Sequence, residues 1–246
     1  IIRETNSLNL WGYRDTDGDG QADEKTLWHA RGSRGGNLEH QPSGLVWNID
    51  NWIYTTYSRH RYRYTAQGAI RGPIPHGSGQ WGIGKDDLGR LYYSTAGGEM
   101  PAMDFQQPIA YGQIRIPGEV SQEFRVCWPL AEMPDVQGGR GRLRDNDTLN
   151  WFTGVAGQSI FRGDRLPSDF YGDLIIPEPV GRLIRRAKVI ENQGMRSLEN
   201  AYPQKEFIAS KDPNFRPVYS ATGPDGCLYI VDMYRGIIQE GAWVRP

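Results

Sequence analysis

The sequence predicts an all-β fold in which short antiparallel hairpins repeat around a common axis, as in a β-propeller. The chain of 246 residues contains 31 Gly and 16 Pro, a density that interrupts long helices. It also contains 8 Trp, 13 Tyr and 7 Phe, which offer large buried surfaces to a core made of short strands. In addition, one hairpin pattern with an acidic turn recurs along the chain.

The recurring pattern is a small residue, an apolar pair, an acidic turn and an aromatic-rich strand. It occurs four times, in Gly44–Thr56, Gly79–Thr95, Leu166–Pro179 and Ser220–Asp232. Each copy predicts two short strands joined by a tight turn of Asp, Asn or Gly. Equivalent residues of the four copies lie 38, 83 and 54 residues apart. Because a propeller blade takes roughly 40 to 50 residues, the interval of 83 predicts two blades, one of them degenerate.

We expect residues 1–246 to form a single propeller domain of about four to five blades. A propeller ring closes only when all its blades are present, so the sequence is expected to be a fragment of a longer chain. A two-layer sandwich would also have short strands, but not a recurring aromatic hairpin at this spacing. The helical signal is weak and predicts at most one turn, at Ser197–Tyr202.

Charge, hydropathy and cysteine content exclude several classes of protein. The 28 Lys and Arg balance 29 Asp and Glu, for a net charge of −1, so the basic signature of a nucleic-acid-binding protein is absent. No run approaches the ~18 apolar residues of a membrane-spanning helix. Cys127 and Cys227 are too few for a disulfide framework. They are expected to be free thiols, with a single bridge between them as the alternative.

A short acidic loop near the N-terminus has the spacing of a calcium-binding loop. Carboxylates at its positions 1, 3 and 5 are followed by Gly20, which permits the sharp turn that brings several oxygens onto one cation. Position 12 is Thr26 rather than the bidentate Glu of an EF-hand, so we expect a calcium-stabilised hairpin loop and not a sensor. The alternative is an acidic surface turn without metal. The expected ligands are Asp15, Asp17, Asp19, the carbonyl of Gln21, and Asp23.

The incomplete ligand set of this loop indicates where the protein functions. A loop without its twelfth ligand binds calcium weakly and fills only where calcium is plentiful, which is outside the cytoplasm. We therefore expect a periplasmic or other extracytoplasmic location, with membrane association through partners.

The position of His40 in the sequence makes this residue a candidate for acid–base chemistry. It precedes a predicted strand, at a junction between blades where propeller loops approach the axis, and histidine titrates near neutral pH. Its role would be that of a general base. The alternative is a structural histidine hydrogen-bonded to a neighbouring loop.

Arginines gather in the predicted loops between blades, and 23 of the 28 basic residues are Arg. Converging guanidinium groups would form a site for a ligand with several carboxylates. Alternatively, each Arg pairs with a nearby acid such as Asp164, Asp169, Glu178 or Asp232 and joins adjacent blades, which we expect for most of them. The arginines concerned are Arg162, Arg182, Arg185, Arg186, Arg216 and Arg235.

A second arginine cluster lies on one predicted strand. Arg59, Arg61 and Arg63 alternate along Tyr57–Tyr64 and would share one face of that strand, about 7 Å apart. We expect this face to be solvated, and binding of an anionic partner is the alternative.

Several segments together resemble one bacterial family. They are DTDGDGQADE, EHQPSGLVWNIDNWIY, GQWGIGKDDLGRLYYST, GQSIFRGDRLP, PEPVGRLIRR and FRPVYSATGPDGCLYIVDMYRGIIQE. The sequence resembles the propeller domain of bacterial membrane-associated dehydrogenases that are linked to c-type haem domains. That propeller is more distantly similar to sorbosone dehydrogenase and to soluble glucose dehydrogenase, six-bladed enzymes that use pyrroloquinoline quinone (PQQ) and calcium.

The resemblance implies roles for individual residues. His40 would abstract the hydroxyl proton of a sugar or alcohol substrate, and Arg216 would bind a carboxylate of PQQ. Arg182 is a weaker match, and Arg162 would complete the arginine cluster. Electrons would pass to a c-type cytochrome or to membrane-bound electron-transfer subunits. The calcium of the loop Asp15–Glu24 would be structural, because this loop lies between strands.

Two functions follow from these observations. The first is a PQQ-type sugar or alcohol dehydrogenase with His40 as the base. The second is a non-catalytic, calcium-stabilised propeller that serves as a scaffold subunit of an electron-transfer complex. A carbohydrate-binding module with Trp and Tyr platforms is a third possibility, for which the sequence has no distinctive motif.

Overall fold

A computed structural model describes residues 2–3, 8–30, 40–75, 79–95, 100–112, 114–133 and 140–238. In this part of the chain all regular structure is β, apart from three 3-10 turns of three residues each, η1 (Ile109–Tyr111), η2 (Arg140–Arg142) and η3 (Ser168–Phe170). No helix of the described residues has the length and apolar character to cross a bilayer. The predicted all-β class is therefore confirmed.

The described strands form five antiparallel sheets that follow one another along the sequence. The first contains β1 (Ile2–Arg3), β2 (Leu10–Arg14) and β3 (Glu24–His29); the second contains β4 (Val46–Trp47), β5 (Ile53–Tyr54), β6 (His60–Thr65) and β7 (Gly68–Pro73). The third contains β8 (Ile83–Lys85), β9 (Leu91–Thr95) and β10 (Met100–Met103). The fourth contains β11 (Ser159–Ile160), β12 (Leu174–Glu178), β13 (Leu183–Asn192), β14 (Met195–Asn200) and β15 (Ile208–Ala209), and the last contains β16 (Pro217–Thr222) and β17 (Leu228–Asp232).

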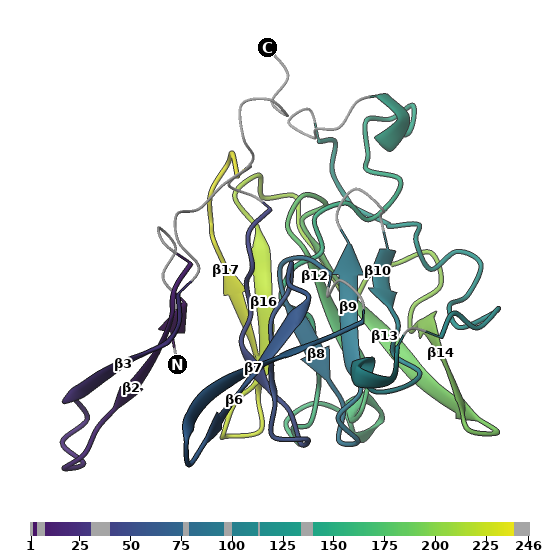
Figure 1. Cartoon of the computed structure of the whole chain (residues 1–246). Coiled ribbons are helices and arrows are strands. Elements are labelled where there is room, and N and C mark those ends of the chain that lie inside the picture. Colours follow the sequence, from purple (N-terminus) through teal and green to yellow (C-terminus); the bar gives the residue numbers. More distant parts are fainter. Residues whose placement is uncertain are drawn as a thin grey trace.

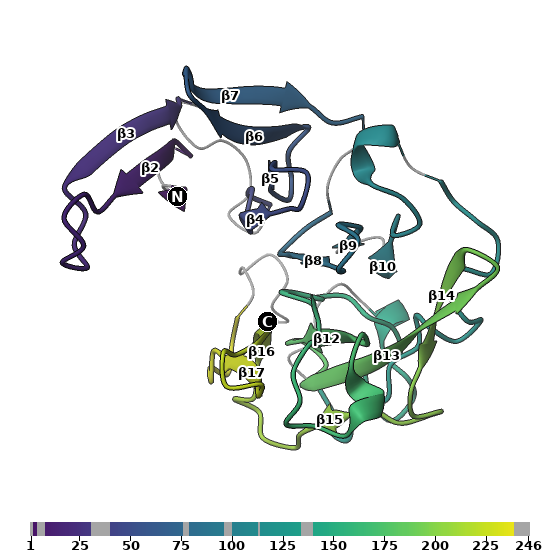
Figure 2. The same ribbon diagram turned by 90° about the horizontal axis from the view of Figure 1, so that it is seen from below.

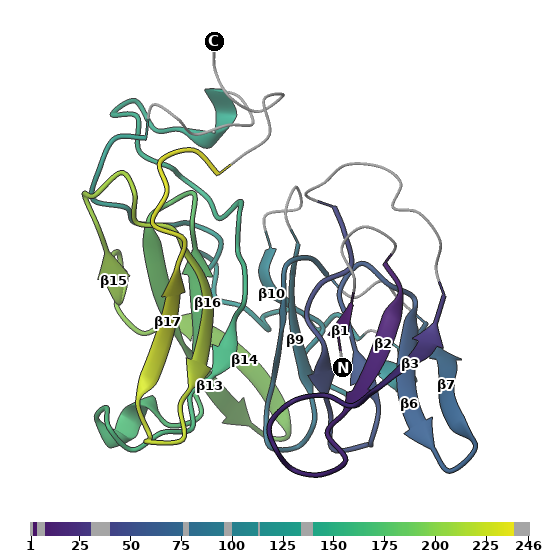
Figure 3. The same ribbon diagram turned by 90° about the vertical axis from the view of Figure 1, so that its left-hand side faces the viewer.

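The five sheets are arranged along an arc, as in a propeller (Figures 1 and 2). Four inner strands form the inside of the arc, because β4 contacts β8, β8 contacts β11, and β11 contacts β16. The first sheet lies outside this series and contacts the second sheet through β3 and β7. Figure 3 shows its hairpin turn at the same end of the molecule as the β16–β17 turn.

The inner strands touch through their main chains. A Cβ atom placed on Gly82, before β8, would lie 2.7 Å from the nitrogen of Gly157, before β11. The Gly157 N–H donates to the Trp81 carbonyl at 2.7 Å, and the Gly157 carbonyl accepts the Ser220 N–H at 2.8 Å. Gly157 has φ +53°, a conformation that favours glycine. Main-chain hydrogen bonds therefore join the sheets at the hub, meaning the starts of these inner strands.

The acidic turns of the repeat share one hydrogen-bonding pattern. In each, one carboxylate oxygen accepts the N–H two residues later, which closes the turn. The other oxygen accepts a tyrosine hydroxyl from the following strand. The pairs are Asp50 and Tyr54 at 2.6 Å, Asp86 and Tyr92 at 3.4 Å, and Asp225 and Tyr229 at 2.9 Å. These turns confirm the hairpins predicted in the first, second and fourth copies.

The third copy, Leu166–Pro179, differs from the prediction. Its first half contains η3 instead of a strand, and β12 pairs with β11, which precedes the copy, and with β13, which follows it. The predicted helical turn at Ser197–Tyr202 was also wrong, because most of this segment lies in β14 and pairs with β13.

Within the interval predicted to contain a degenerate blade, the described residues between β10 and β11 form no sheet. Between β10 and β11 only isolated bridges occur, such as Val126 with Trp151. The buried side chains of this segment, including Phe124 and Phe152, belong instead to the largest apolar cluster, with Leu174 and Leu183 of the fourth sheet. The interval is therefore a covering segment of the fourth sheet, which accounts for its length without a further blade.

Both cysteines are free, as expected. Cys127 is fully buried in the core, where desolvation raises the pKa of its thiol.

Candidate functional site

The predicted site residues lie in two groups, one at the start of the inner strands and the other at their opposite end. One end is the hub described above. The other, which we call the turn end, contains the hairpin turns that follow the inner strands. His40 precedes β4 and Arg216 precedes β16, whereas Arg162 follows β11. The structure therefore places Arg162 at the turn end, away from the hub residues His40 and Arg216.

His40 is half-buried and stacks on Tyr57, with ring centroids 5.6 Å apart and an angle of 13° between the ring planes. Tyr57 has φ +53°, which is uncommon for a bulky residue. Its N–H donates to the Gly79 carbonyl of the next sheet at 3.1 Å, which holds the backbone in this conformation. His40 thus rests on an aromatic ring fixed at the hub. Leu38 and Glu39 lie outside the described residues.

Arg216 is buried and its guanidinium is surrounded by main-chain carbonyls. Nε donates to Arg235 O at 3.2 Å, Nη1 donates to Pro179 O at 3.0 Å, and Nη2 donates to Gly236 O at 2.5 Å. The first and third carbonyls follow β17, while Pro179 follows β12. Arg216 therefore ties the last sheet to the fourth.

Arg182 lies in the turn between β12 and β13, a few residues from the carbonyls that Arg216 binds. It is buried, has φ +54°, and donates from Nη1 to the Glu132 carbonyl at 3.1 Å. This bond ties the turn to the covering segment. Arg182 and Arg216 thus approach the same turn, and each donates to carbonyls of the chain.

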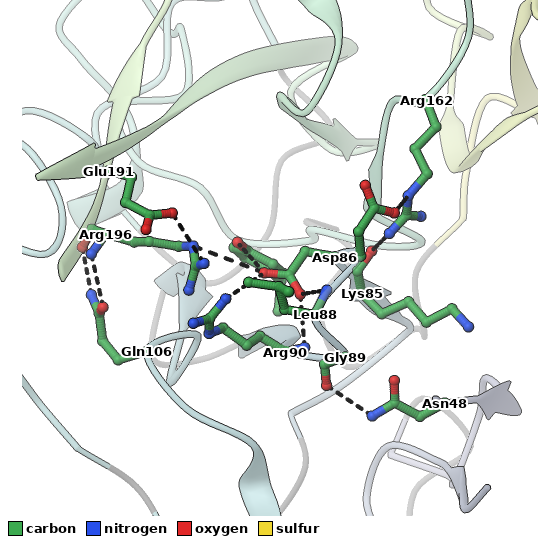
Figure 4. A network of polar contacts seen from close by, with 12 residues as sticks. Asn48, Lys85, Asp86, Leu88, Gly89, Arg90, Gln106, Arg162, Glu191 and Arg196 are labelled. Atoms are coloured by element: carbon green, nitrogen blue, oxygen red, sulfur yellow. Dashed lines mark hydrogen bonds and ion pairs between the residues drawn. The ribbon is translucent and has the colours of Figure 1, made fainter. Parts of the chain in front are cut away.

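Arg162 belongs to a polar network at the turn end (Figure 4). Its Nη2 donates to Lys85 O at 2.9 Å and its Nε forms an ion pair with Asp87. In the same hairpin turn, Asp86 faces Arg90 at 3.8 Å and Arg196 of β14 at 3.9 Å. Because the amide of Asn48 also donates to Gly89 O at 2.8 Å, the β8–β9 turn connects the second, third and fourth sheets.

Arg185 and Arg186 were expected in a loop between blades but lie in β13, where both pair with acids of the fourth sheet region and do not join adjacent blades. Arg185 and Glu206 form a bidentate ion pair in which both side chains are fully buried. Arg186 pairs with Asp173 at 2.6 Å and with Asp169 at 2.9 Å. Sequence reasoning missed Glu206, because the only signal is a single Glu between predicted strands, 21 residues from its partner.

Glu178, named above as a possible arginine partner, instead accepts peptide N–H groups. The donors belong to Thr153 at 2.9 Å, Gly154 at 2.8 Å, Val180 at 3.1 Å and Gly181 at 3.4 Å. Burial raises the pKa of this carboxyl, and the N–H donors oppose the rise. The same donors explain how a carboxylate is accommodated in the core.

Arg61 and Arg63 also have partners within the chain. Both guanidinium groups lie over the ring of Trp52, at 4.3 Å and 4.5 Å from its centroid. Arg61 additionally reaches Asp50 at 3.5 Å and donates to the Tyr54 hydroxyl at 3.0 Å. The stacking on Trp52 explains how two like charges are tolerated on one strand face.

The acidic loop joins β2 to β3 at the turn end. One carboxylate oxygen from each of Asp15, Asp17 and Asp19 lies within 4.8 Å of the others, and all three residues are exposed. Asp15 accepts the N–H groups of Gly20 at 2.9 Å and Gly18 at 2.6 Å, which lower the pKa of its carboxyl. Three carboxylates converging at this spacing fit a hard cation such as calcium.

The remaining predicted ligands are arranged differently. Asp23 accepts the N–H and the hydroxyl of Thr16, both at 2.7 Å, and does not belong to the group of three carboxylates. The Gln21 side chain donates to Asp19 at 3.2 Å, and the Gln21 N–H donates to the same carboxylate at 2.7 Å. Of the predicted ligands, Asp15, Asp17 and Asp19 are therefore the ones placed to hold a metal ion together.

PQQ fits the described arrangement poorly. Of the three arginines predicted to bind its carboxylates, Arg162 lies at the opposite end from Arg216, and Arg216 and Arg182 are buried and donate to carbonyls. A carboxylate ligand of Arg216 would have to displace bonds that connect two sheets.

Comparison with solved structures supports the fold. The chain is similar to a glucose dehydrogenase at 14% identity, with a TM-score of 0.51, over 94% of this chain and 71% of that chain. A second glucose dehydrogenase structure gives 13% identity and a TM-score of 0.46, over 92% of this chain and 71% of that one. At such identities the likeness concerns the fold and carries no activity with it.

A third solved structure, an oxidoreductase of Thermus thermophilus described as a glucose dehydrogenase, is 17% identical. The match covers 99% of this chain and 90% of that chain, with a TM-score of 0.40. No curated protein is significantly similar to the chain in sequence. One family matches all of residues 1–246, and the chain belongs to that family, described as a domain of unknown function (DUF7133).

Proposed function

We propose that this chain is a non-catalytic, calcium-stabilised propeller that serves as a scaffold in an extracytoplasmic electron-transfer complex at the membrane. The observation that carries the proposal is the commitment of Arg162, Arg182 and Arg216 to groups of the chain itself. They join sheets, whereas a site for a polycarboxylate cofactor needs guanidinium groups that converge on a ligand. The likeness to a glucose dehydrogenase fold is consistent with an origin among dehydrogenase-like propellers.

A binding experiment tests this proposal. Purified protein is titrated with PQQ in the presence of calcium, while quinone absorbance, intrinsic fluorescence and sugar-dependent dye reduction are followed. We expect neither binding at micromolar PQQ nor dye reduction, because the buried arginines exchange their carbonyl partners only at the cost of sheet contacts. PQQ binding accompanied by dye reduction, in protein whose circular dichroism shows a β fold, would refute the scaffold.

A quinoprotein-like dehydrogenase that oxidises a sugar or alcohol and passes electrons to a cytochrome is the second candidate. The observation that favours it is the position of His40, held at the hub by its stack on Tyr57. Should the titration above reveal activity, replacing His40 by Asn should lower kcat by roughly a hundredfold or more, as for loss of a general base. A matched replacement of His29, which lies at the end of β3, should leave kcat unchanged.

Calcium is part of the proposal because the three carboxylates of the acidic loop converge. Calcium at about a hundred times its Kd would stabilise the folded state by ~2.7 kcal/mol. For a domain of this size that corresponds to an increase in Tm of about 5 to 10 °C. We therefore expect chelation with EGTA to lower Tm by this amount and added calcium to restore it, measured by differential scanning calorimetry.

Two variants locate the calcium effect. Asp17→Ala should abolish the difference in Tm between calcium and EGTA, because it removes one of the three converging carboxylates. Glu24→Gln changes a neighbouring exposed acid outside that group and should preserve the difference. A Tm that does not respond to EGTA in the unmodified protein would contradict a structural calcium.

A further inference from the structure

Three arginines on one face of the second sheet have no role in the proposed function. Arg61 and Arg63 belong to β6, and Arg59 directly precedes it. The ladder of the sheet continues past β6, because the Arg59 carbonyl accepts the Ile74 N–H at 2.9 Å. Alternate residues of a strand share one face at intervals of about 7 Å. We call this surface of Arg59, Arg61 and Arg63 the arginine face. Asp50 neutralises Arg61, with their atoms 3.5 Å apart.

Arg63 is fixed in position but lacks a hydrogen-bond acceptor. It is half-buried, its guanidinium lies 4.5 Å from the centroid of the Trp52 ring, and its Nε is buried without a partner. Within the described ranges, no carboxylate or carbonyl binds Arg63, and none binds the exposed side chain of Arg59. A guanidinium held flat on a ring loses little conformational freedom when it binds a carboxylate. Arg63 is therefore preorganised for an anionic ligand.

The arginine face lies within the arc and not at one of its ends. The alternate residues Tyr62 and Tyr64 point to the opposite side of β6, where their rings contact His29 and Trp28 of the first sheet. Trp52, on the arginine side, packs against the apolar cluster shared by the second and third sheets. The sheets on both sides of β6 are therefore present in the structure. Further sheets at either end of the arc would not cover the arginine face.

The surroundings of Arg63 favour a ligand larger than one carboxylate. Its register partner on β7, Ile70, is 40% exposed, whereas Ile74 further along the same face is buried. A single ion pair at an exposed site is worth about 1 kcal/mol at most, so a free carboxylate would bind weakly. A ligand that reaches both Arg59 and Arg63 and also covers Ile70 would gain two ion pairs and apolar contact. Four residues of extended chain separate these arginines, which is about 13 Å.

We propose that the arginine face binds an extended acidic segment of a partner protein, with two carboxylates four residues apart that pair with Arg59 and Arg63. The spacing matches because the segment and β6 have the same rise per residue. Each carboxylate can accept two parallel N–H bonds from its guanidinium. Arg61, which lies between them, already has Asp50 as its partner, so the middle of the segment needs no charge. The inference is independent of the scaffold proposal, because it involves neither calcium nor a cofactor.

A peptide titration followed by NMR tests the inference. The probe is a short peptide of Gly and Ser with two Glu four residues apart, added to the ¹⁵N-labelled chain at low salt. We expect the Nε–H resonance of Arg63, assigned by its loss in Arg63→Met, to shift. Arg63→Met and Arg59→Met should each weaken binding at least about fivefold, because each removes one charge-assisted pair. Arg14→Met, at an exposed arginine at the end of β2, is the matched control and should leave the affinity unchanged.

Three results would overturn the proposal. The first is the absence of any shift at millimolar peptide, or equal affinity of the unmodified chain and Arg63→Met, with circular dichroism showing that both are folded. The second is equal binding of a peptide of the same composition whose two Glu are adjacent, which would indicate attraction of charge without regard to spacing. The third is an equal shift with acetate at the same carboxylate concentration, which would assign the site to free carboxylates instead of a partner segment.

Discussion

Replacing Gly157 by Ala should destabilise the protein by about 3 kcal/mol or more, measured as the free energy of unfolding in urea. A Cβ at this position would lie 2.4 Å from the Val218 carbonyl oxygen and 2.5 Å from the Cα of Tyr219. Both neighbours are main-chain atoms of the last sheet, so relief requires two sheets to separate. In addition to this overpacking, an alanine held in the left-handed conformation of Gly157 costs roughly 1 kcal/mol.

Gly194 provides the matched control. It also has a positive φ, +80°, in the turn between β13 and β14, but a Cβ there would have no atom within 4 Å. Gly194→Ala should therefore cost only the conformational part, about 1 kcal/mol. Equal losses for the two variants would show that the close approach at the hub does not constrain the fold.

The buried ion pair between Arg185 and Glu206 should give the second large effect. Arg185 also donates to the carbonyls of Phe124 at 2.6 Å and Val126 at 2.8 Å, and its guanidinium lies 4.6 Å from the centre of the Phe152 ring. Burial raises the pKa of Glu206, and the positive charge of Arg185 opposes the rise. Glu206→Gln leaves Arg185 buried without its counter-charge and should cost about 3 to 5 kcal/mol.

A double-mutant cycle in urea separates the pair from its surroundings. The double variant Arg185→Met with Glu206→Leu should lose less stability than the single variants Arg185→Met and Glu206→Leu lose in sum. The reason is that the double variant leaves no uncompensated charge. As a surface control, Asp164→Asn removes the exposed pair with Arg165, whose atoms are 3.7 Å apart, and should change stability little. Additive losses at residues 185 and 206 would contradict the coupling.

Local signals in the sequence predicted the local structure. The turns around Asp50, Asp86 and Asp225 were predicted correctly because an aspartate closes its own turn and the alternating strands follow at once. The convergence of Asp15, Asp17 and Asp19 was predicted for the same reason, since their spacing and a flexible glycine bring the side chains together within one loop. Neither prediction required knowledge of distant contacts.

Hydrogen-bond partners that lie far apart in the sequence could not be predicted from local sequence patterns. The four carbonyls around Arg216 come from two segments, of which one lies more than thirty residues upstream. A carbonyl belongs to every residue, so no sequence pattern marks those that an arginine will bind. The interval between β10 and β11 was misinterpreted for a similar reason: its apolar residues cover the fourth sheet, and spacing alone does not distinguish this from a blade.

The glycine-mediated contacts at the hub have a consequence for how this fold varies. The spacing of neighbouring sheets there is set by the length of an N–H···O bond, which is the same for any sequence. Substitutions on the outer strands can therefore alter solubility, partners and ion binding while the curvature of the arc is preserved. Curvature and surface chemistry are in this sense separately adjustable properties of the protein.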